Sequence, residues 1–123
     1  MKGGGAKIWY FPDGYLPHKR EGEKVVPHEA LMLLNVGDAD ANALIDLYFS
    51  DREPIRDIPV KVPAERIISL RMDAPADLGC AVIPELTQYA IRITSDQNLV
   101  AQFGRLDTTQ ANLAYYGSDG FHE

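Results

Sequence analysis

The feature that most constrains the fold is a series of short apolar segments, each ended by a turn signal. Residues 42–50 show the pattern most clearly, because apolar side chains alternate there with Asp46, Tyr48 and Ser50. Strict alternation indicates a β-strand with one buried face. Comparable segments occupy residues 7–11, 28–36, 57–62, 65–72, 87–95 and 98–106. Since no amphipathic helix is evident before residue 107, we expect an all-β protein.

The spacing of the turn signals favours an antiparallel β-sandwich of about seven strands. We expect residues 28–36 to form a hairpin with residues 42–50. A second hairpin is expected from residues 87–95 and 98–106, turning at Asp96 and Gln97. The segment 57–62 is predicted to be an edge strand, because Pro59 has no N–H to give to a neighbouring strand.

The 123 residues fit one domain, which we place over residues 1–123. Residues 1–5 are rich in glycine and residues 117–123 lack a clear pattern, so both ends are expected to be flexible. A short helix is expected at residues 110–116. The segment 30–34 is apolar at every position, which indicates that both of its faces are covered, one by the core and the other by a second layer or another subunit.

Composition excludes several classes of protein. A formal charge of −6 and a pI near 5.0 argue against a nucleic-acid partner, which a basic surface would normally bind. The lone Cys80 cannot form an intramolecular disulfide, and the first residues lack the apolar run of a signal peptide. The longest apolar run, residues 30–34, falls far short of the roughly 20 residues that span a bilayer. We therefore expect a cytoplasmic protein without membrane insertion.

Charged residues follow the last apolar strand, where Arg105 and Asp107 end the segment that begins at Asn98. Burying either charge alone would cost several kcal/mol, so each needs a polar partner or a ligand. We expect the intramolecular partners of this strand end to be Asp51, Glu53 and Arg66, because a guanidinium binds a carboxylate with two parallel hydrogen bonds.

Other polar residues also lie at predicted strand ends, and together they form a candidate ligand-binding set. Each of them taken alone has an ordinary reading as a cap, turn or pairing residue, and Trp9 as a core aromatic. As a group they offer the acceptors, planar donors and aromatic faces that a sugar or another small polar metabolite would need. The set comprises Trp9, Asp13, His28, Glu29, Asn35, Tyr48, Ser50, Asp51, Glu53, Arg66, Arg105, Asp107 and Gln110.

Motifs for catalysis or metal binding are incomplete. Asp38, Asp40 and Asn42 have the opening spacing of a calcium loop, but the sixth position lacks glycine and the twelfth lacks glutamate. His28 and Glu29 begin like a zinc-protease motif without its second histidine. We expect no cofactor, no metal and no enzymatic activity, and the alternative of catalysis through His28 with a carboxylate rests on little more than two polar groups.

Several phrases in the same order resemble the sensory rhodopsin transducer family. They are residues 13–17 (DGYLP), 28–29 (HE), 34–41 (LNVGDADA), 48–54 (YFSDREP), 62–66 (VPAER) and 105–111 (RLDTTQA). The resemblance runs over most of residues 9–111 and leaves out residues 73–85 and the tail.

This resemblance implies a small cytoplasmic β-sandwich that assembles as a homotetramer and works in signalling. Relatives are thought to act beside a membrane photoreceptor, and the wider superfamily is inferred to bind small molecules of the sugar class. Two functions follow as hypotheses. One is a non-catalytic sensor of a sugar-like metabolite; the other is a transducer that works by protein contact alone, through residues 18–24 or the tail.

Overall fold

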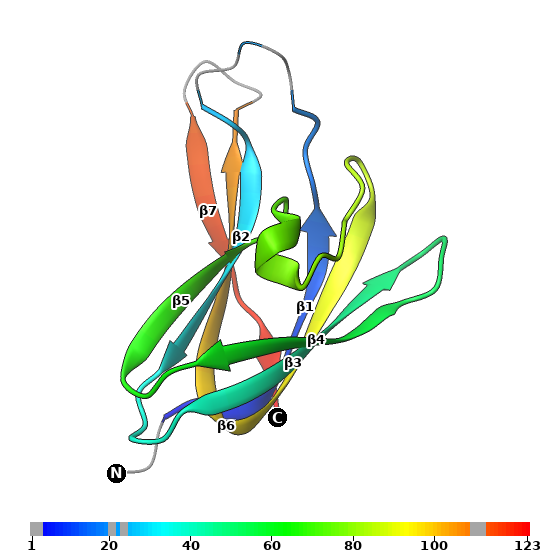
Figure 1. The fold of residues 1–123 in the computed structure, drawn as a ribbon. Helices are drawn as coiled ribbons and strands as arrows, with labels where there is room; N and C mark the ends of the chain where they lie inside the picture. Colours follow the sequence, from blue (N-terminus) through cyan, green and yellow to red (C-terminus); the bar gives the residue numbers. More distant parts are fainter. Residues whose placement is uncertain (1–3, 20–21, 23–24, 109–112) are drawn as a thin grey trace.

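A computed structural model describes residues 4–19, 22, 25–108 and 113–123, and it is all-β (Figure 1). Within these residues the strands form one eight-stranded antiparallel sheet that folds on itself as a sandwich. A 3-10 turn, η1 (Pro75–Leu78), interrupts the loop after the fifth strand. The strands are β1 (Ala6–Tyr15), β2 (His28–Asn35), β3 (Ala41–Phe49), β4 (Ile55–Val62), β5 (Arg66–Arg71), β6 (Gln88–Asp107), β7 (Ala114–Ser118) and β8 (Phe121–His122).

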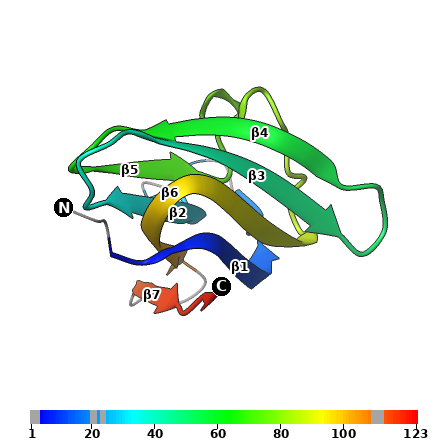
Figure 2. The same cartoon turned by 90° about the horizontal axis from the view of Figure 1, so that it is seen from below.

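Strand β6 connects the two halves of the sandwich (Figure 2). Its first half pairs with β1 and β3, and its second half pairs with β2 and β7. The first group has the order β4-β3-β6-β1-β8, while β5 joins the second group by pairing with β2. The expected edge position of Pro59 is confirmed, because β4 ends this order.

The hairpin expected at Asp96 and Gln97 is wrong, because β6 runs through both residues as one strand of 20 residues. The carboxylate of Asp96 accepts a hydrogen bond from the backbone N–H of Asn42 at 2.8 Å, so the chain bends there alongside β3 instead of reversing. The buried residues have the same parity before and after this bend, where Gln97 is exposed: Tyr89, Ile91, Ile93, Ser95, Leu99, Ala101 and Phe103.

The hairpin expected between residues 28–36 and 42–50 is also wrong. Strand β2 pairs with β5 and β6, whereas β3 pairs with β4 and β6, so the short link between them crosses from one half to the other. The side chain of Asn35 holds this link: its Nδ2 donates to the carbonyls of Ala39 at 2.8 Å and Val62 at 3.0 Å, and its Oδ1 accepts from the N–H of Gly37 at 3.0 Å.

The C-terminal residues form strands where a helix and a flexible tail were expected. Residues 114–116 belong to β7, which pairs with the end of β6, while residues 110–112 lie outside the described part of the chain. Strand β8 then pairs with Trp9 and Tyr10 of β1. Ladder hydrogen bonds to two existing strands outweigh the weak local preferences of these residues. Of the N-terminal segment, residues 1–3 lie outside the described part.

The core lies between the two halves of the sandwich. Trp9 is part of it, with 8% of its surface exposed, and its Nε1 donates to the carbonyls of Leu99 at 2.9 Å and Ala6 at 3.2 Å. The inward faces of β2, β3 and β6 supply most of the aliphatic side chains, which include Leu31, Leu33, Ile45, Leu47, Ile91, Ile93 and Leu99. Three buried residues on these inward faces are polar: Ser95 of β6, and Glu29 and Asn35 near the two ends of β2.

Candidate functional site

Glu29 is the centre of the site. It shares the inward parity of Leu31 and Leu33, and its side chain is fully buried. Arg105 lies directly opposite on β6 and shares the inward parity of Phe103. The guanidinium donates to one carboxylate oxygen of Glu29, Oε2, from Nε at 2.7 Å and from Nη2 at 2.6 Å. The cross-strand register therefore sets a buried ion pair at the end of the core.

The second oxygen of Glu29 is also satisfied. Its Oε1 accepts a hydrogen bond from the hydroxyl of Tyr89 at 2.8 Å and from the backbone N–H of Tyr15 at 2.9 Å. A β-bulge between Phe11 and Gly14 carries β1 on to Tyr15 and so presents this N–H. A buried carboxylate is tolerated only with such partners, and here each of the two oxygens of Glu29 accepts two hydrogen bonds.

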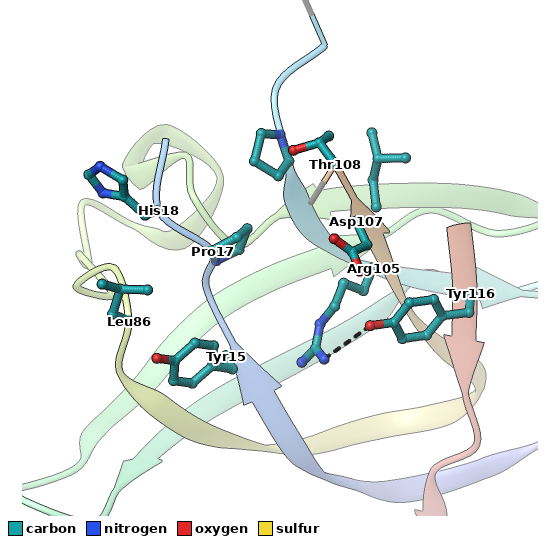
Figure 3. Close-up of a pocket in the computed structure, with 10 residues that line it drawn as sticks. Tyr15, Pro17, His18, Leu86, Arg105, Asp107, Thr108 and Tyr116 are labelled. Atoms are coloured by element: carbon teal, nitrogen blue, oxygen red, sulfur yellow. Dashed lines mark hydrogen bonds between the residues drawn. The ribbon is translucent and has the colours of Figure 1, made fainter. Parts of the chain in front are cut away.

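Arg105 reaches from this buried pair to the surface, where it meets Tyr116 of β7 (Figure 3). Its Nη1 donates to the hydroxyl of Tyr116 at 3.4 Å, and its guanidinium carbon lies 5.8 Å from the centre of that ring. Its Nη2 also donates to the carbonyl of Asp13 at 3.4 Å. The guanidinium is thus fixed on one side by β2 and on the other by β7.

Protonation within the network is well defined. Burial by itself would lower the pKa of Arg105, but the hydrogen bonds to Tyr116 and Glu29 outweigh it and raise that pKa. Burial, together with the nearby charge of Glu29, raises the pKa of Tyr89 far above its usual value. Tyr89 therefore remains a neutral donor and Arg105 a cation at every physiological pH.

A pocket of about 320 Å³ opens above Arg105 (Figure 3). Its walls combine aromatic, proline and aliphatic side chains from β1, β6, β7 and two loops, and its polar groups are few. The residues that line it are Tyr15, Pro17, His18, Pro27, Leu86, Arg105, Leu106, Asp107, Thr108 and Tyr116. We refer to it below as the Arg105 pocket.

The loop that forms one wall of the Arg105 pocket is fastened to the long loop after β5. The N–H of Leu86 donates to the carbonyl of Leu16 at 2.8 Å, and His18 Nδ1 lies 2.8 Å from a carboxylate oxygen of Glu85. Deeper in, Asp73 bridges the ammonium of Lys19 at 2.9 Å and the Nε of Arg71 at 2.8 Å. These contacts hold Pro17 and His18 against the pocket.

Asp73 shows a strong electrostatic effect of this fastening. Its side chain is only 8% exposed, and burial would raise its pKa. The hydrogen bonds from Arg71 and Lys19 outweigh burial and lower the pKa of Asp73 to about 2. The carboxylate is therefore ionised, and paired, throughout the neutral range.

Only part of the candidate set gathers at this pocket. Arg105 and Asp107 line it, Glu29 supports it from below, and Asp13 contributes a backbone carbonyl. His28 is half-buried beside it, with its Nδ1 2.9 Å from the carbonyl of Val26. Gln110 lies outside the described residues.

The rest of the set lies elsewhere. Trp9 is in the core and Tyr48 is on the outer face of β3. Arg66 lies opposite Asn35 at the far end of β2, on the order of 20 Å from Arg105 at the usual rise of a strand. The remaining residues, in the exposed link between β3 and β4, are Ser50, Asp51 and Glu53.

The expected partners of Arg105 are consequently wrong. Asp51 pairs with its own neighbour Arg52, at 2.9 Å, and Arg66 donates to the carbonyl of Glu65 at 3.0 Å. The partner of Arg105 is Glu29, which the sequence places 76 residues away. Cross-strand register, which turn signals alone do not reveal, decides this pairing.

Sequence reasoning missed several residues that build the site. Tyr89 could have been found, because it shares the buried parity of Ile91 and Ile93. Tyr15 is carried to the site by a bulge, and Tyr116 by the pairing of β7 with β6. Pro17, His18 and Leu86 come from loops, where no periodic signal exists.

The described residues were also considered for metal-binding groups and for membrane-spanning helices. No group of three or more histidine, cysteine, aspartate or glutamate side chains in that part of the chain could hold a metal ion. Nor does any helix there have the length and apolar character needed to cross a membrane.

Comparison with known proteins identifies the family. A model described as Anabaena sensory rhodopsin transducer matches residues 4–122. The chain belongs to this family. The match includes residues 73–85, which the sequence phrases alone had left out. No curated protein matches the chain.

Two solved structures support membership of the transducer family. The crystal structure of Thermotoga maritima 1070 is 34% identical, with a TM-score of 0.83, over 97% of this chain and 96% of that chain. The Anabaena sensory rhodopsin transducer itself is 35% identical, with a TM-score of 0.74, over 84% of this chain and 97% of that chain. The chain therefore shares its fold with both of these structures, to which it is similar in sequence at almost the same identity.

Proposed function

We propose that this protein is a non-catalytic cytoplasmic signalling module that binds a small, neutral, polyhydroxylated metabolite of the sugar class in the Arg105 pocket. One observation carries the proposal: the fully buried Glu29 binds Arg105 at the floor of an open pocket through one carboxylate oxygen, while its other oxygen is bound by Tyr89. A buried ion pair is a weak source of stability compared with apolar packing, so its position beneath a pocket supports a role in binding.

The charge of the site favours a neutral ligand over an anionic one. The guanidinium of Arg105 is already compensated by Glu29, so an anionic ligand would gain little from it. What Arg105 offers is fixed N–H donors; what Asp107 offers is an acceptor for hydroxyl groups. Tyr15 and Tyr116 supply aromatic faces for the apolar side of a ring.

The hydrogen bonds of Glu29 and His18 favour binding without catalysis. A general base needs a free lone pair within reach of the substrate, whereas each oxygen of Glu29 already accepts two hydrogen bonds. The ring of His18 is held by Glu85 at 2.8 Å. Membership of a family named for transduction agrees with a signalling role.

A thermal-shift screen followed by calorimetry tests the proposal. The panel contains neutral monosaccharides and disaccharides, the matching sugar phosphates and the matching sugar acids. At least one neutral sugar is expected to raise the melting temperature by mass action, and its phosphate is expected to bind more weakly. A flat response to the whole panel, or a consistent preference for the phosphates, would refute the proposed ligand class.

Two tyrosines on neighbouring positions of β7 provide the variants. Tyr116→Ala removes a wall of the pocket and is expected to weaken sugar binding about tenfold, close to 1.4 kcal/mol. Tyr115→Ala removes an equally large ring from the opposite face of the same strand, away from the pocket lining, and is expected to leave binding unchanged. Equal effects of both substitutions would mean that β7 matters only for stability.

A second candidate function is contact with a membrane photoreceptor, and the family gives the specific reason for it. The structure at 35% identity is named as a sensory rhodopsin transducer, so a receptor partner is a reasonable proposal for this chain too. Co-purification with membranes from the source cells, followed by mass spectrometry, tests it. Recovery of a rhodopsin-type protein would support contact signalling; recovery of the chain in the soluble fraction alone would count against it.

We also propose assembly as a homotetramer, with the outer face of β5, β2 and β6 as one contact. Ile67, Leu34 and Val100 lie side by side there, and Ile67 is 63% exposed while Val100 is 39% exposed. An apolar row on a solvent-facing sheet is typical of an interface between subunits. Light scattering should give four times the chain mass, and Ile67→Asp should lower it; a monomeric mass for the unmodified protein would contradict the assembly.

A further inference from the structure

A second concave site lies on the outer face of the sheet formed by β8, β1, β6 and β3. Its volume is about 250 Å³. The side chains that shape it are mostly aromatic, and Phe121 is the most exposed of the large apolar residues described, at 78%. We call it the aromatic groove; its principal lining residues are Tyr10, Phe11, Pro12, Tyr48, Ile91 and Phe121.

Strand register explains why this groove exists. Tyr10 lies opposite Phe121 on one side and opposite Arg92 on the other. Tyr48 lies opposite Ala90. Since the methyl group of Ala90 fills little of the space between the neighbouring rings, a hollow remains between Tyr10 and Tyr48 on the surface of the sheet. The rings of Tyr10 and Tyr48 are partly exposed and that of Phe121 is exposed, and such rings around a hollow are characteristic of recognition surfaces.

The wall formed by Phe121 is positioned by close packing. Gly120 sits flat on the ring of Phe11, and a Cβ added at Gly120 would meet that ring at 2.6 Å. Phe11 itself is 2% exposed and belongs to the core. The groove is therefore part of the folded structure, with its outer wall held by β8 and its floor shared with the core.

Two arginines flank the groove. Arg56 lies over the ring of Tyr48, with its guanidinium carbon 5.7 Å from the ring centre. Arg92 lies opposite Tyr10 on one side and Asp46 on the other, and its hydrogen bond with the side chain of Tyr48 raises its pKa. The nearby Asp46 is already engaged by the N–H of Asp57 at 2.9 Å and by the hydroxyl of Tyr48 at 3.5 Å.

We propose that the aromatic groove docks a segment of a partner protein that carries an apolar, preferably aromatic, side chain between acidic residues. The apolar hollow would receive the ring, while Arg56 and Arg92 would meet the flanking carboxylates. This charge complementarity is local, because the whole chain has a net charge of −6 and would otherwise repel an acidic partner. An aromatic anchor in a pocket with a charged rim is the usual arrangement at the centre of an interface.

This docking site is independent of the ligand proposed for the Arg105 pocket. The two pockets share no lining residue. The outcome of the sugar screen therefore bears on the first site alone, and the experiment below bears on the second alone.

Fluorescence polarisation with two labelled peptides tests the proposal. One peptide carries two phenylalanines flanked and separated by glutamates, and the other has lysine in place of every glutamate. The acidic peptide is expected to bind about tenfold more tightly than the basic one. Phe121→Ser is expected to weaken its binding about tenfold, since a truncated anchor residue loses most of its contact.

Matched variants distinguish a loss of binding in the groove from the general effect of removing an exposed side chain. Leu113→Ser removes an exposed apolar side chain, 52% exposed, that lines neither pocket, and should leave the affinity unchanged. Arg56→Gln should reduce the preference for the acidic peptide. Because Arg56 is exposed, its replacement is expected to leave the fold intact.

Several results would overturn the proposal. Equal affinity for both peptides, no measurable binding of either, or no effect of Phe121→Ser would each remove the docking site. Displacement of the peptide by 3-phenylpropionate at the same affinity would make the groove a site for a small aromatic acid. A change in the light-scattering mass of Phe121→Ser would make it a contact between copies of this chain.

Discussion

Two carboxylate–arginine pairs at strand ends differ in how far they are buried, and burial determines how much each pair matters for stability. In the first, Glu29 and Arg105 join β2 to β6, with side-chain exposures of 0% and 22%. In the second, Asp51 and Arg52 are neighbours in the link between β3 and β4, with exposures of 56% and 43%. The second pair is held by two hydrogen bonds of 2.9 Å, so its geometry is no worse than that of the first.

The difference lies in what happens when one partner is removed. Water can solvate Arg52 if Asp51 is lost, because both side chains are already at the surface. Removal of Glu29 would take the acceptor from the hydroxyl of Tyr89, the N–H of Tyr15 and the Nε–H of Arg105, inside or at the edge of the core. The buried pair therefore controls both stability and the shape of the pocket, whereas the surface pair controls neither.

The largest expected effect follows from Glu29→Ala. Breaking a buried ion pair by removing one partner typically costs about 3–5 kcal/mol, and we expect a loss of that order in the free energy of unfolding. Urea denaturation followed by tryptophan fluorescence measures it, since Trp9 lies in the core. A loss no greater than that of a surface substitution would mean that Glu29 and Arg105 are not paired in solution.

A smaller effect is expected from Tyr89→Phe, which removes one hydrogen bond to Glu29 while keeping the ring. Loss of a donor to a buried charged group should cost about 1–3 kcal/mol and lower the melting temperature. Tyr115→Phe serves as the control, because its ring is 58% exposed. Identical melting temperatures for the two variants would argue against the bond between Tyr89 and Glu29.

The pH dependence of stability tests the fastening of the pocket wall. The folded pKa of Asp73, about 2, lies below its ordinary value of 3.8, so its ionised form stabilises the fold. This contribution is complete above about pH 4 and is lost as the pH falls towards 2; its size is about 2 kcal/mol. Asp73→Asn should therefore show a smaller loss of stability between pH 4 and pH 2 than the unmodified protein. Parallel curves for the two proteins would contradict this assignment.

The smallest effect is expected at the surface pair. Asp51→Ala should leave the melting temperature and sugar binding unchanged within error, because both Asp51 and Arg52 are solvated. Differential scanning calorimetry and the thermal-shift screen measure the two quantities. A loss comparable to that of Glu29→Ala would remove the distinction between the two pairs.

Part of the fold could be predicted from parity along a single strand. The alternation of apolar residues at Tyr89, Ile91 and Ile93 resumes with the same parity at Leu99, Ala101 and Phe103, which indicates one long strand. Residues 30–34 are apolar at every position, so they do not by themselves show which way Glu29 faces. The sequence analysis gave more weight to the turn-forming residues Asp96 and Gln97 than to the alternation from Tyr89 to Phe103, and it therefore predicted a hairpin there. Alternation over many residues is therefore better evidence than two polar residues of turn type.

The rest of the site could not be predicted, because it depends on contacts between distant segments. Which carboxylate meets Arg105 is set by the register of β2 on β6, and one position of slip would turn Glu29 to the outside. Tyr116 reaches the pocket only because β7 pairs with β6, in a region where local propensity favoured a helix. Tertiary pairing overrides such weak local preferences.

The central claim is that Arg105, held by Glu29, contacts a neutral sugar. A two-dimensional ¹⁵N–¹H spectrum of the arginine Nε–H groups tests it most directly, with Arg52 and Arg66 as internal references. The Nε–H of Arg105 should be protected from exchange with water by its bond to Glu29, and its resonance should move on addition of the sugar selected by the screen. Movement of the Arg52 or Arg66 resonances while that of Arg105 stays fixed would contradict the account.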